Sequence, residues 1–256
     1  MSTCRVISCS NMKGGTGKTT TVNSLAAHCA RKGFRVAVID LDPQSNLTIG
    51  FGVDPQDLKG SMYDVLAPQS IPIEQVMVEK EGLFLAPAHM DMVRLEMQLV
   101  SLYGRETILN KKLLAIKDNY DLIIIDCPPS LNIFTINALC ASDYVIIPIQ
   151  CSSYYALYGI AQLLESINWV QQELNPNLEV LGVALTMENR TRISGQIIEE
   201  VNRQFEKLVF KTVIRQNVKL SEAPAMGTSI FGYAASSQGA DDYARLAEEV
   251  VKRAGL

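Results

Sequence analysis

The sequence has few residues that could hold a transition metal or form a disulfide framework. It contains two histidines, His28 and His89, and its six cysteines include no C-x-x-C pair. Zinc-finger and metalloprotease patterns are therefore absent. Cysteines without such pairing are typical of a protein whose thiols are reduced. The sequence also lacks a signal-peptide layout and any apolar run near the ~20 residues that a membrane-spanning helix needs. We therefore expect a soluble cytoplasmic protein.

The sequence also lacks an excess of positive charge. Its 256 residues carry 23 Lys plus Arg against 27 Asp plus Glu, a formal net charge of −4. This balance argues against a protein that binds nucleic acid constitutively. Hydrophobic residues make up 48% of the chain and charged residues 20%, so a large core can be buried. There is no low-complexity segment and no internal repeat, and the loop-rich stretch 43–87 is too short for a second domain. One domain over residues 1–256 is predicted.

Short apolar runs alternate with amphipathic segments of helical length along the whole chain. Runs that predict strands lie at 6–9, 35–40, 83–86, 122–126, 144–149 and 180–185. Patterns that predict helices lie at 19–32, 92–102, 107–117, 131–141, 155–173, 193–205 and 240–253, and Gly33 is the expected C-cap of the first helix. Strands that are apolar on both faces and alternate with helices predict an α/β fold, with a doubly wound, mostly parallel sheet flanked by helices.

Residues 13–19 form a glycine-rich motif, Lys-Gly-Gly-Thr-Gly-Lys-Thr, between the first predicted strand and the first predicted helix. The generic phosphate loop G-x-x-x-x-G-K-[ST] would need glycine at position 12, where this chain has Met12. The second half of the pattern is intact, and glycines before a helix let backbone N–H groups face phosphate oxygens. In this pattern Lys18 reaches the β- and γ-phosphates and the Thr19 hydroxyl ligates Mg²⁺.

A second motif stands at the end of the predicted strand 122–126. An apolar run that ends in aspartate is the Walker B arrangement, in which a buried strand delivers one carboxylate to the magnesium shell. Asp126 is therefore expected to hold the metal ion through water. Cys127 follows directly, but no base partner is identifiable, so we interpret it as a packing residue rather than a nucleophile.

Together these motifs resemble the ParA/MinD family of P-loop ATPases, whose deviant Walker A motif matches the heptad. The resemblance implies ATP and Mg²⁺ as cofactors and a nucleotide site formed by Lys13, Gly14, Gly15, Thr16, Gly17, Lys18, Thr19 and Thr20. It also implies that Lys13 reaches the partner's nucleotide across an ATP-bound homodimer. Residues 40–44, Asp-Leu-Asp-Pro-Gln, resemble the family's switch I, so Asp42 is expected to position the attacking water. Lys13, Lys18 and Asp42 are thus the implied catalytic residues, while Asp40 could instead hydrogen-bond the phosphate loop.

The resemblance continues to the C-terminus and covers nearly all of the chain. Residues 217–224, Asn-Val-Lys-Leu-Ser-Glu-Ala-Pro, resemble the family segment near the adenine, and 237–249 resemble its closing helix. Just before this segment the family has Ile-Pro-Arg, where this chain has Ile214-Arg215-Gln216. Arg215 and Asn217 are expected at the nucleotide, with Arg215 also compensating for the missing charge. Without the resemblance, residues 217–224 and 237–249 predict a turn, a short helix and a docked amphipathic helix.

A local basic segment bears on what the family resemblance means for function. Residues 186–219 carry seven bases and four acids, so this segment is +3 while the remainder is −7. Sequence-independent binding to phosphates needs only such a patch. The resemblance implies nonspecific DNA binding through Arg190, Arg192, Arg215 and Lys219. A solvated, charge-balanced helix face is the competing interpretation of the same bases.

Other outputs of the family fit less well. The tail 247–256 has two acids against two bases, and core packing explains its apolar positions better than lipid insertion does. Cys127 is not at a convincing iron–sulfur ligand position, and a dethiobiotin-type synthetase would lack the Lys13 heptad and the switch I segment. We predict a cytoplasmic, nucleoid-associated partition ATPase that dimerises on ATP, binds nonspecific DNA and positions chromosome or plasmid cargo with a ParB-like partner, without a membrane. A MinD-like membrane-associated ATPase and a positioning ATPase for a non-DNA cargo are the alternatives.

Overall fold

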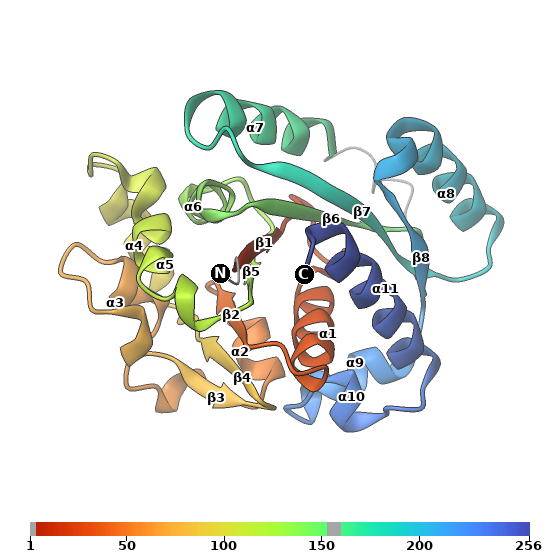
Figure 1. Cartoon of the computed structure of the whole chain (residues 1–256), viewed down its shortest axis with the longest axis horizontal. Coiled ribbons are helices and arrows are strands. Elements are labelled where there is room, and N and C mark those ends of the chain that lie inside the picture. The colour runs from red at the N-terminus through yellow and green to blue at the C-terminus, as the bar shows by residue number, and fades with distance from the viewer. Residues whose placement is uncertain (1–3, 153–159) are drawn as a thin grey trace.

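The fold is built on one twisted sheet, and the computed structural model describes residues 4–152 and 160–256 of it (Figure 1). The strands are β1 (Arg5–Cys9), β2 (Val36–Asp40), β3 (Val78–Lys80), β4 (Leu83–Ala86), β5 (Leu122–Asp126), β6 (Tyr144–Gln150), β7 (Glu179–Glu188) and β8 (Val209–Arg215). Their order in the sheet is β3-β4-β2-β5-β1-β6-β7-β8. Within the described residues β3 pairs antiparallel with β4 and every other neighbouring pair is parallel. The predicted doubly wound, mostly parallel sheet is confirmed.

The helices of seven or more residues follow the predicted ones to within a few residues, whereas the short helices that the structure describes at 46–50, 62–66 and 230–233 were not predicted. They are α1 (Lys18–Arg31), α2 (Asn46–Gly50), α3 (Met62–Leu66), α4 (Met92–Leu99), α5 (Ile108–Leu114), α6 (Ile133–Ala141), α7 (Ile160–Glu173), α8 (Arg192–Phe205), α9 (Val218–Ala225), α10 (Ile230–Tyr233) and α11 (Gln238–Ala254). The C-cap of α1 is Lys32, one residue before the predicted cap Gly33, which follows it at a φ of 93°. Residues 155–159 of the predicted helix 155–173 lie outside the described part of the chain.

Helices cover both faces of the sheet. Figure 1 shows α1 and α11 on one side and α6 and α7 on the other. On the first side, α1, α2, α10 and α11 share one core cluster with residues such as Ile7 and Ile124. On the second side, α3 to α6 pack over β2 and β5, and α6 to α8 pack over β6 to β8. The strands β2 and β5 are buried along their whole length, which explains their continuous apolar sequences.

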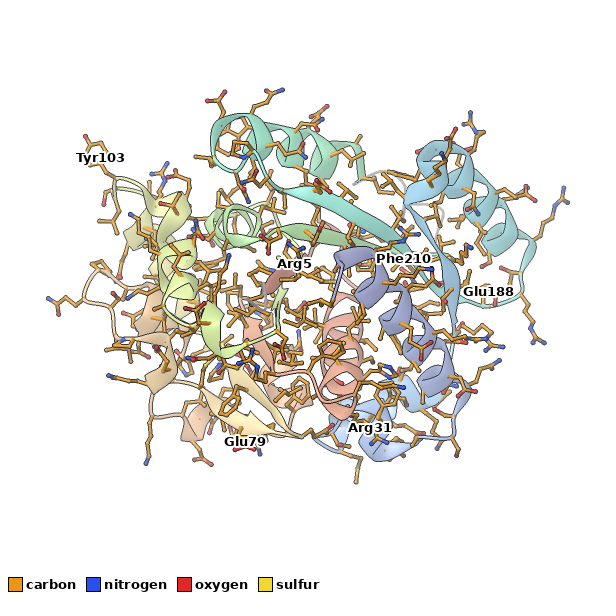
Figure 2. The ribbon with its side chains drawn as sticks, viewed as in Figure 1. Arg5, Arg31, Glu79, Tyr103, Glu188 and Phe210 are labelled. Carbon is orange, nitrogen blue, oxygen red and sulfur yellow. The ribbon has the colours of Figure 1, made fainter. Side chains whose placement is uncertain are left out.

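The C-terminal helix α11 is part of the core. Its apolar side chains, including Tyr243, Leu246 and Val250, are almost fully buried in the cluster that also holds α1. The Arg253 guanidinium lies 4.2 Å from the ring centroid of Phe210 and donates to the carbonyls of Leu181, Leu208 and Val209. Phe210 is a residue of β8 and is labelled beside α11 in Figure 2. The prediction that core packing explains the apolar tail is therefore confirmed. Among the described residues no helix is long and apolar enough to cross a membrane.

Two strands were not predicted, and both lie at the edges of the sheet. The strand β3 has three residues and is at most half-buried, so it carries little apolar signal. The strand β8, Val-Phe-Lys-Thr-Val-Ile-Arg, mixes buried and polar positions, because β7 is the one strand that pairs with it among the described residues. It lies inside the basic segment 186–219, where its charges masked its strand pattern.

The order of the strands in the sheet indicates where a ligand-binding site lies. From the central strand β1 the chain moves to β2 on one side, whereas β6 to β8 extend the sheet on the other side. In such sheets ligands bind outside the carboxyl ends of the strands, where the direction of winding reverses. The glycine-rich loop follows β1 directly and leads into α1, so it lies at that point.

Candidate nucleotide-binding site

The glycine-rich loop adopts a backbone that glycine permits. Gly15 and Gly17 have φ of 74° and 87°, in the left-handed region that side chains disfavour. Gly17 is the N-cap of α1, a helix of 14 residues, so the loop ends on the unpaired N–H groups of a long helix. This is the backbone arrangement that binds phosphate groups.

The two lysines of the motif lie on the same loop. The Lys18 ammonium donates to the carbonyl oxygen of Lys13 at 3.1 Å, and Lys18 is 7% exposed. A buried ammonium against the loop can stabilise the negative charge of a phosphate strongly, because little solvent screens it. Lys13 is half-buried and its backbone N–H donates to the side-chain oxygen of Asn11 at 3.0 Å. The role of Lys13 across a dimer stays a prediction.

Two polar residues that we did not single out hold the loop in place. The Asn11 amide donates to the Pro148 carbonyl at 2.7 Å while its oxygen accepts from Lys13. The Thr186 hydroxyl donates to the Thr16 carbonyl at 2.8 Å, so the end of β7 supports the loop that follows β1. Both side chains are 1% exposed. Their signal in the sequence was a polar residue at the end of an apolar strand.

The predicted metal residues Thr19 and Asp126 are in direct contact. The Thr19 hydroxyl donates to Asp126 Oδ2 at 2.7 Å, and Asp126 is completely buried. Among the described residues nothing donates a hydrogen bond to Asp126 Oδ1. Burial raises the pKa of Asp126 well above its usual range, and the nearby carboxyl of Asp40 raises it further.

These features fit a magnesium ion. A buried carboxylate oxygen without a partner needs a cation or an ordered water, and Mg²⁺ prefers oxygen ligands while keeping several waters. Thr19 and Asp126 would hold the ion, whose charge neutralises the phosphate oxygens when it is bound.

Asp40 has a different partner from the one that we considered. It does not bond to the phosphate loop but accepts from the backbone of Asp42 at 3.1 Å and from the backbone and hydroxyl of Thr48 at 2.9 and 2.7 Å. That suggested contact was therefore wrong, and Asp40 instead anchors the segment after β2. Asp40 pairs in register with Asp126 on the neighbouring strand, and burial raises the pKa of Asp40 to about 7.

Asp42 lies on this anchored segment. It is 7% exposed, and its carboxylate accepts from the backbone N–H of Gln44 at 3.0 Å. Its charge adds to the rise in the pKa of Asp126 that burial causes. The structure thus gathers the loop 13–19, Asp42 and Asp126 at the carboxyl ends of β1, β2 and β5, although water positioning by Asp42 stays a prediction.

The predicted C-terminal contacts lie at the end of β8. The Asn217 side chain caps α9 by accepting from the Lys219 backbone at 2.9 Å. The Arg215 guanidinium pairs with the buried carboxylate of Asp242 at 2.5 Å. These contacts give both residues structural roles, and their contacts with a nucleotide stay predictions.

The predicted DNA residues lie at or shortly after the ends of β7 and β8. Arg190 and Arg192 are exposed at the start of α8, and Arg190 has a φ of 57°. Lys219 lies on α9 and pairs with Glu222 at 2.8 Å. The register pairs Glu188 with Arg215, which places the loop that carries Arg190 beside the end of β8.

This fold and this phosphate loop define a P-loop nucleotide hydrolase. A family model described as an AAA domain matches residues 4–180. The chain is 47% identical to the sporulation initiation inhibitor protein Soj of Bacillus subtilis, over 96% of this chain and 98% of that protein. It is 42% identical to the chromosome partitioning protein ParA of Myxococcus xanthus, over 97% and 88%. A solved structure of cobyrinic acid a,c-diamide synthase from Mycobacterium smegmatis with bound ADP and magnesium superposes with a TM-score of 0.84, at 36% identity, over 96% and 93% of the two chains.

The chain belongs to the ParA/Soj family of partition ATPases. It is an ATPase, and ATP and Mg²⁺ are its cofactors.

Proposed function

We propose that this ATPase dimerises on ATP, binds DNA without sequence specificity and positions chromosome or plasmid cargo with a ParB-like partner. The names of the two relatives above support the partition role. The observation that carries the DNA-binding part is a short covalent connection between the nucleotide site and exposed bases. Thr186 holds the phosphate loop, and Arg190 follows four residues later.

In this proposal the nucleotide state controls the use of the bases. Lys18 stabilises phosphate charge, Asp42 orients the attacking water, and Lys13 joins two subunits around ATP. One monomer offers a modest basic surface to DNA. Two surfaces that face the same way bind together, because the second contact then benefits from a high effective concentration. Hydrolysis separates the subunits and releases the DNA.

The proposal is tested by DNA retention in the presence of ATP. The wild-type protein should bind random-sequence duplex with ATP and magnesium, weakly without ATP, and less as salt rises. Arg190→Glu should lose this binding, whereas Lys59→Glu, an exposed charge reversal outside the basic segment, should keep it. Asp42→Ala should form ATP-dependent dimers that remain on DNA, because hydrolysis is blocked. Normal retention by Arg190→Glu, or absent dimers with Asp42→Ala, would contradict the corresponding assignment.

A small-molecule synthetase is a second candidate, because the synthase structure above is similar over nearly the whole chain. A cavity of about 1010 Å³, lined by Pro43 and Ser45 among others, is large enough for a small-molecule substrate. Stimulation of ATP turnover by random-sequence DNA favours the partition role. Stimulation by cobyrinic acid, with no response to DNA, favours the synthetase. Co-sedimentation with liposomes in the presence of ATP would instead support a MinD-like role.

A further inference from the structure

The carboxylate of Asp40 holds both ends of the segment that carries Asp42. Its Oδ1 accepts from the backbone N–H of Asp42 at 3.1 Å, where the segment begins. Its Oδ2 accepts from the backbone N–H and the hydroxyl of Thr48 at 2.9 and 2.7 Å, inside α2. One carboxylate therefore closes residues 42–48 into a loop. We call Asp40, together with its bonds to Asp42 and Thr48, the Asp40 clamp.

The Thr48 hydroxyl joins the Asp40 clamp to the next strand of the sheet. It donates to Asp40 and accepts from the backbone N–H of Ala88 at 3.0 Å. Ala88 follows β4, which pairs with β2 in parallel register, so this hydroxyl connects the ends of two neighbouring strands. Asp40, Thr48 and Ala88 are each 0% exposed. Solvent therefore cannot replace a bond that is lost here, and the hydroxyl fixes the loop against the end of β4.

The loop 42–48 contains a residue in a disfavoured backbone conformation. Ser45 has a φ of 55°, in the left-handed region that side chains disfavour, and it is 3% exposed. Its backbone N–H donates to the Asp42 carbonyl at 2.8 Å, and the backbone N–H of Gln44 donates to Asp42 Oδ1 at 3.0 Å. These bonds orient the Asp42 side chain within the loop. A disfavoured conformation persists only where the surrounding structure holds it, and the Asp40 clamp provides that hold.

The support of Asp42 is separate from the support of the phosphate loop. The phosphate loop is held by the Asn11 amide on Pro148 and by the Thr186 hydroxyl, which both come from other strands. A carboxylate that orients water must stay in place, since a displacement of about 1 Å in a catalytic site can lower the rate about 100-fold. Loss of the Asp40 clamp should therefore slow hydrolysis while ATP binding stays nearly intact.

We propose that Thr48 is a positioning residue for ATP hydrolysis, which acts through Asp40 to hold Asp42 where it orients the attacking water. This inference rests on the role of Asp42 in the proposed function and adds the residues that keep Asp42 in place. A general contribution of Thr48 to stability would lower the amount of folded protein. Positioning instead lowers the rate of hydrolysis at each occupied site, and the two effects can be measured separately.

ATP turnover in the presence of magnesium, expressed per ATP-binding site, tests this assignment. Thr48→Val keeps the shape of the side chain but can neither donate to Asp40 nor accept from Ala88. We expect its kcat to fall roughly tenfold to hundredfold, with KM for ATP changed by less than about twofold. Thr48→Ser keeps the hydroxyl and should stay within about threefold of the wild-type kcat. The matched control is Ser142→Ala, which also removes a buried hydroxyl, bonded to the Ala138 carbonyl before the start of β6, and should keep the wild-type kcat.

A double variant distinguishes positioning from a general structural role. If Thr48 acts through Asp42, Thr48→Val should cause no further loss of ATP turnover in an Asp42→Ala background, because the carboxylate that it positions is already gone. A loss in that background as large as the loss in the wild-type background would overturn the inference.

The outcomes also separate Thr48 from the proposed function. If Asp42→Ala turns over ATP like the wild-type protein, the proposed role of Asp42 fails, and the positioning role of Thr48 fails with it. If Asp42→Ala loses turnover but Thr48→Val behaves like Ser142→Ala, the positioning role is overturned and the role of Asp42 stands. Thermal unfolding of each variant checks folding. Thr48→Ala, which removes the hydroxyl and leaves a smaller side chain, serves as the independent variant if Thr48→Val is unstable.

Discussion

The Thr19 hydroxyl donates to Asp126 at 2.7 Å although 107 positions separate the two residues in the chain. This bond ties the first turn of α1 to the end of β5 and uses one oxygen of a fully buried carboxylate. Among the described residues the other oxygen accepts no hydrogen bond. Leaving such an oxygen unpaired costs about 1–3 kcal/mol, so we interpret it as a cost that is recovered when the cofactor binds.

Asp126→Asn should separate magnesium binding from folding. The amide keeps an acceptor for Thr19 but removes the charge that attracts the ion, so affinity for Mg²⁺ should fall about 10–100-fold. The thermal shift that ATP gives in the presence of magnesium should shrink accordingly. The matched control is Asp143→Asn. Asp143 lies at the amino ends of the strands, away from the site, and its carboxylate accepts from the Val6 backbone at 2.8 Å. An equal loss of the magnesium-dependent shift in both variants would contradict the assignment of Asp126.

The paired carboxyls of Asp40 and Asp126 predict an unusual pH dependence of the nucleotide-free protein. Burial raises the pKa of Asp40 to about 7 and raises that of Asp126 in the same direction. The folded state therefore binds more protons than the unfolded state, in which an aspartate titrates near ~3.9. The free energy of unfolding should fall as pH rises from about 4 to about 7, by at most about 1.4 kcal/mol per pH unit for each proton.

Urea unfolding in a chelator at pH 5 and pH 7.5 measures this effect. The stability of the wild-type protein should decrease between the two values, and Asp126→Asn should decrease less, because one buried charge is gone. Magnesium with ATP should remove the decrease by neutralising the carboxylates. If the free energies of unfolding of the wild-type protein and of Asp126→Asn fall equally between pH 5 and pH 7.5, the carboxyls of Asp40 and Asp126 are not responsible for the decrease.

The central strands and the phosphate loop could be predicted because their signals are local. Within the predicted strands, residues 122–125 and 36–39 are apolar without interruption, and the heptad 13–19 lies where a strand passes into a helix. The supports of the loop could not be predicted in this way. Thr186 contacts Thr16 across 170 positions, and the Asn11 amide contacts Pro148 across 137. Such contacts depend on which strands become neighbours, and no local pattern encodes that.

The charged residues near the C-terminus show a second limit. A charge count identified the basic segment 186–219 but not which bases were paired, since Asp242, the partner of Arg215, lies outside that segment. The count also omitted Arg245, which reaches the same surface from α11. Likewise Asp40 was recognised as a possible structural residue, but its partner Thr48 became apparent only once α2 was placed.

Thr186→Val should weaken nucleotide binding without a large change of side-chain shape. Valine cannot donate to the Thr16 carbonyl, which is 2.8 Å from the native hydroxyl, so the phosphate loop loses its contact with β7. A lost buried hydrogen bond of about 1–3 kcal/mol corresponds to a roughly fivefold to 150-fold loss of ATP affinity if the loop bears the whole cost. Thr212→Val is the matched control, because its hydroxyl bonds to Glu249 away from the site. Equilibrium binding of a fluorescent ATP analogue measures both, and equal affinities would argue against support by Thr186.

Asp242→Asn should lower the free energy of unfolding at neutral pH and change it little at acidic pH. Burial raises the pKa of Asp242, but the hydrogen bonds that Arg215 and Arg245 donate to its carboxylate lower it overall. The folded state therefore binds fewer protons at this carboxylate than the unfolded state does. The stability that this carboxylate contributes is present above its unfolded pKa of ~3.9 and is lost as pH falls through its lower folded value. The amide leaves two guanidinium groups without a counter-charge, at a cost of about 1–3 kcal/mol after allowance for the solvent exposure of both arginines.

Chemical denaturation at pH 7 and pH 3 distinguishes this role from simple packing. The wild-type protein and Asp242→Asn should differ at pH 7 and converge at pH 3, where the native carboxylate is also becoming protonated. Arg245→Gln should recover part of the lost stability when it is combined with Asp242→Asn, because one guanidinium group then no longer repels the other. A constant difference at both pH values would mean that the shape of the side chain, and not its charge, holds β8 against α11.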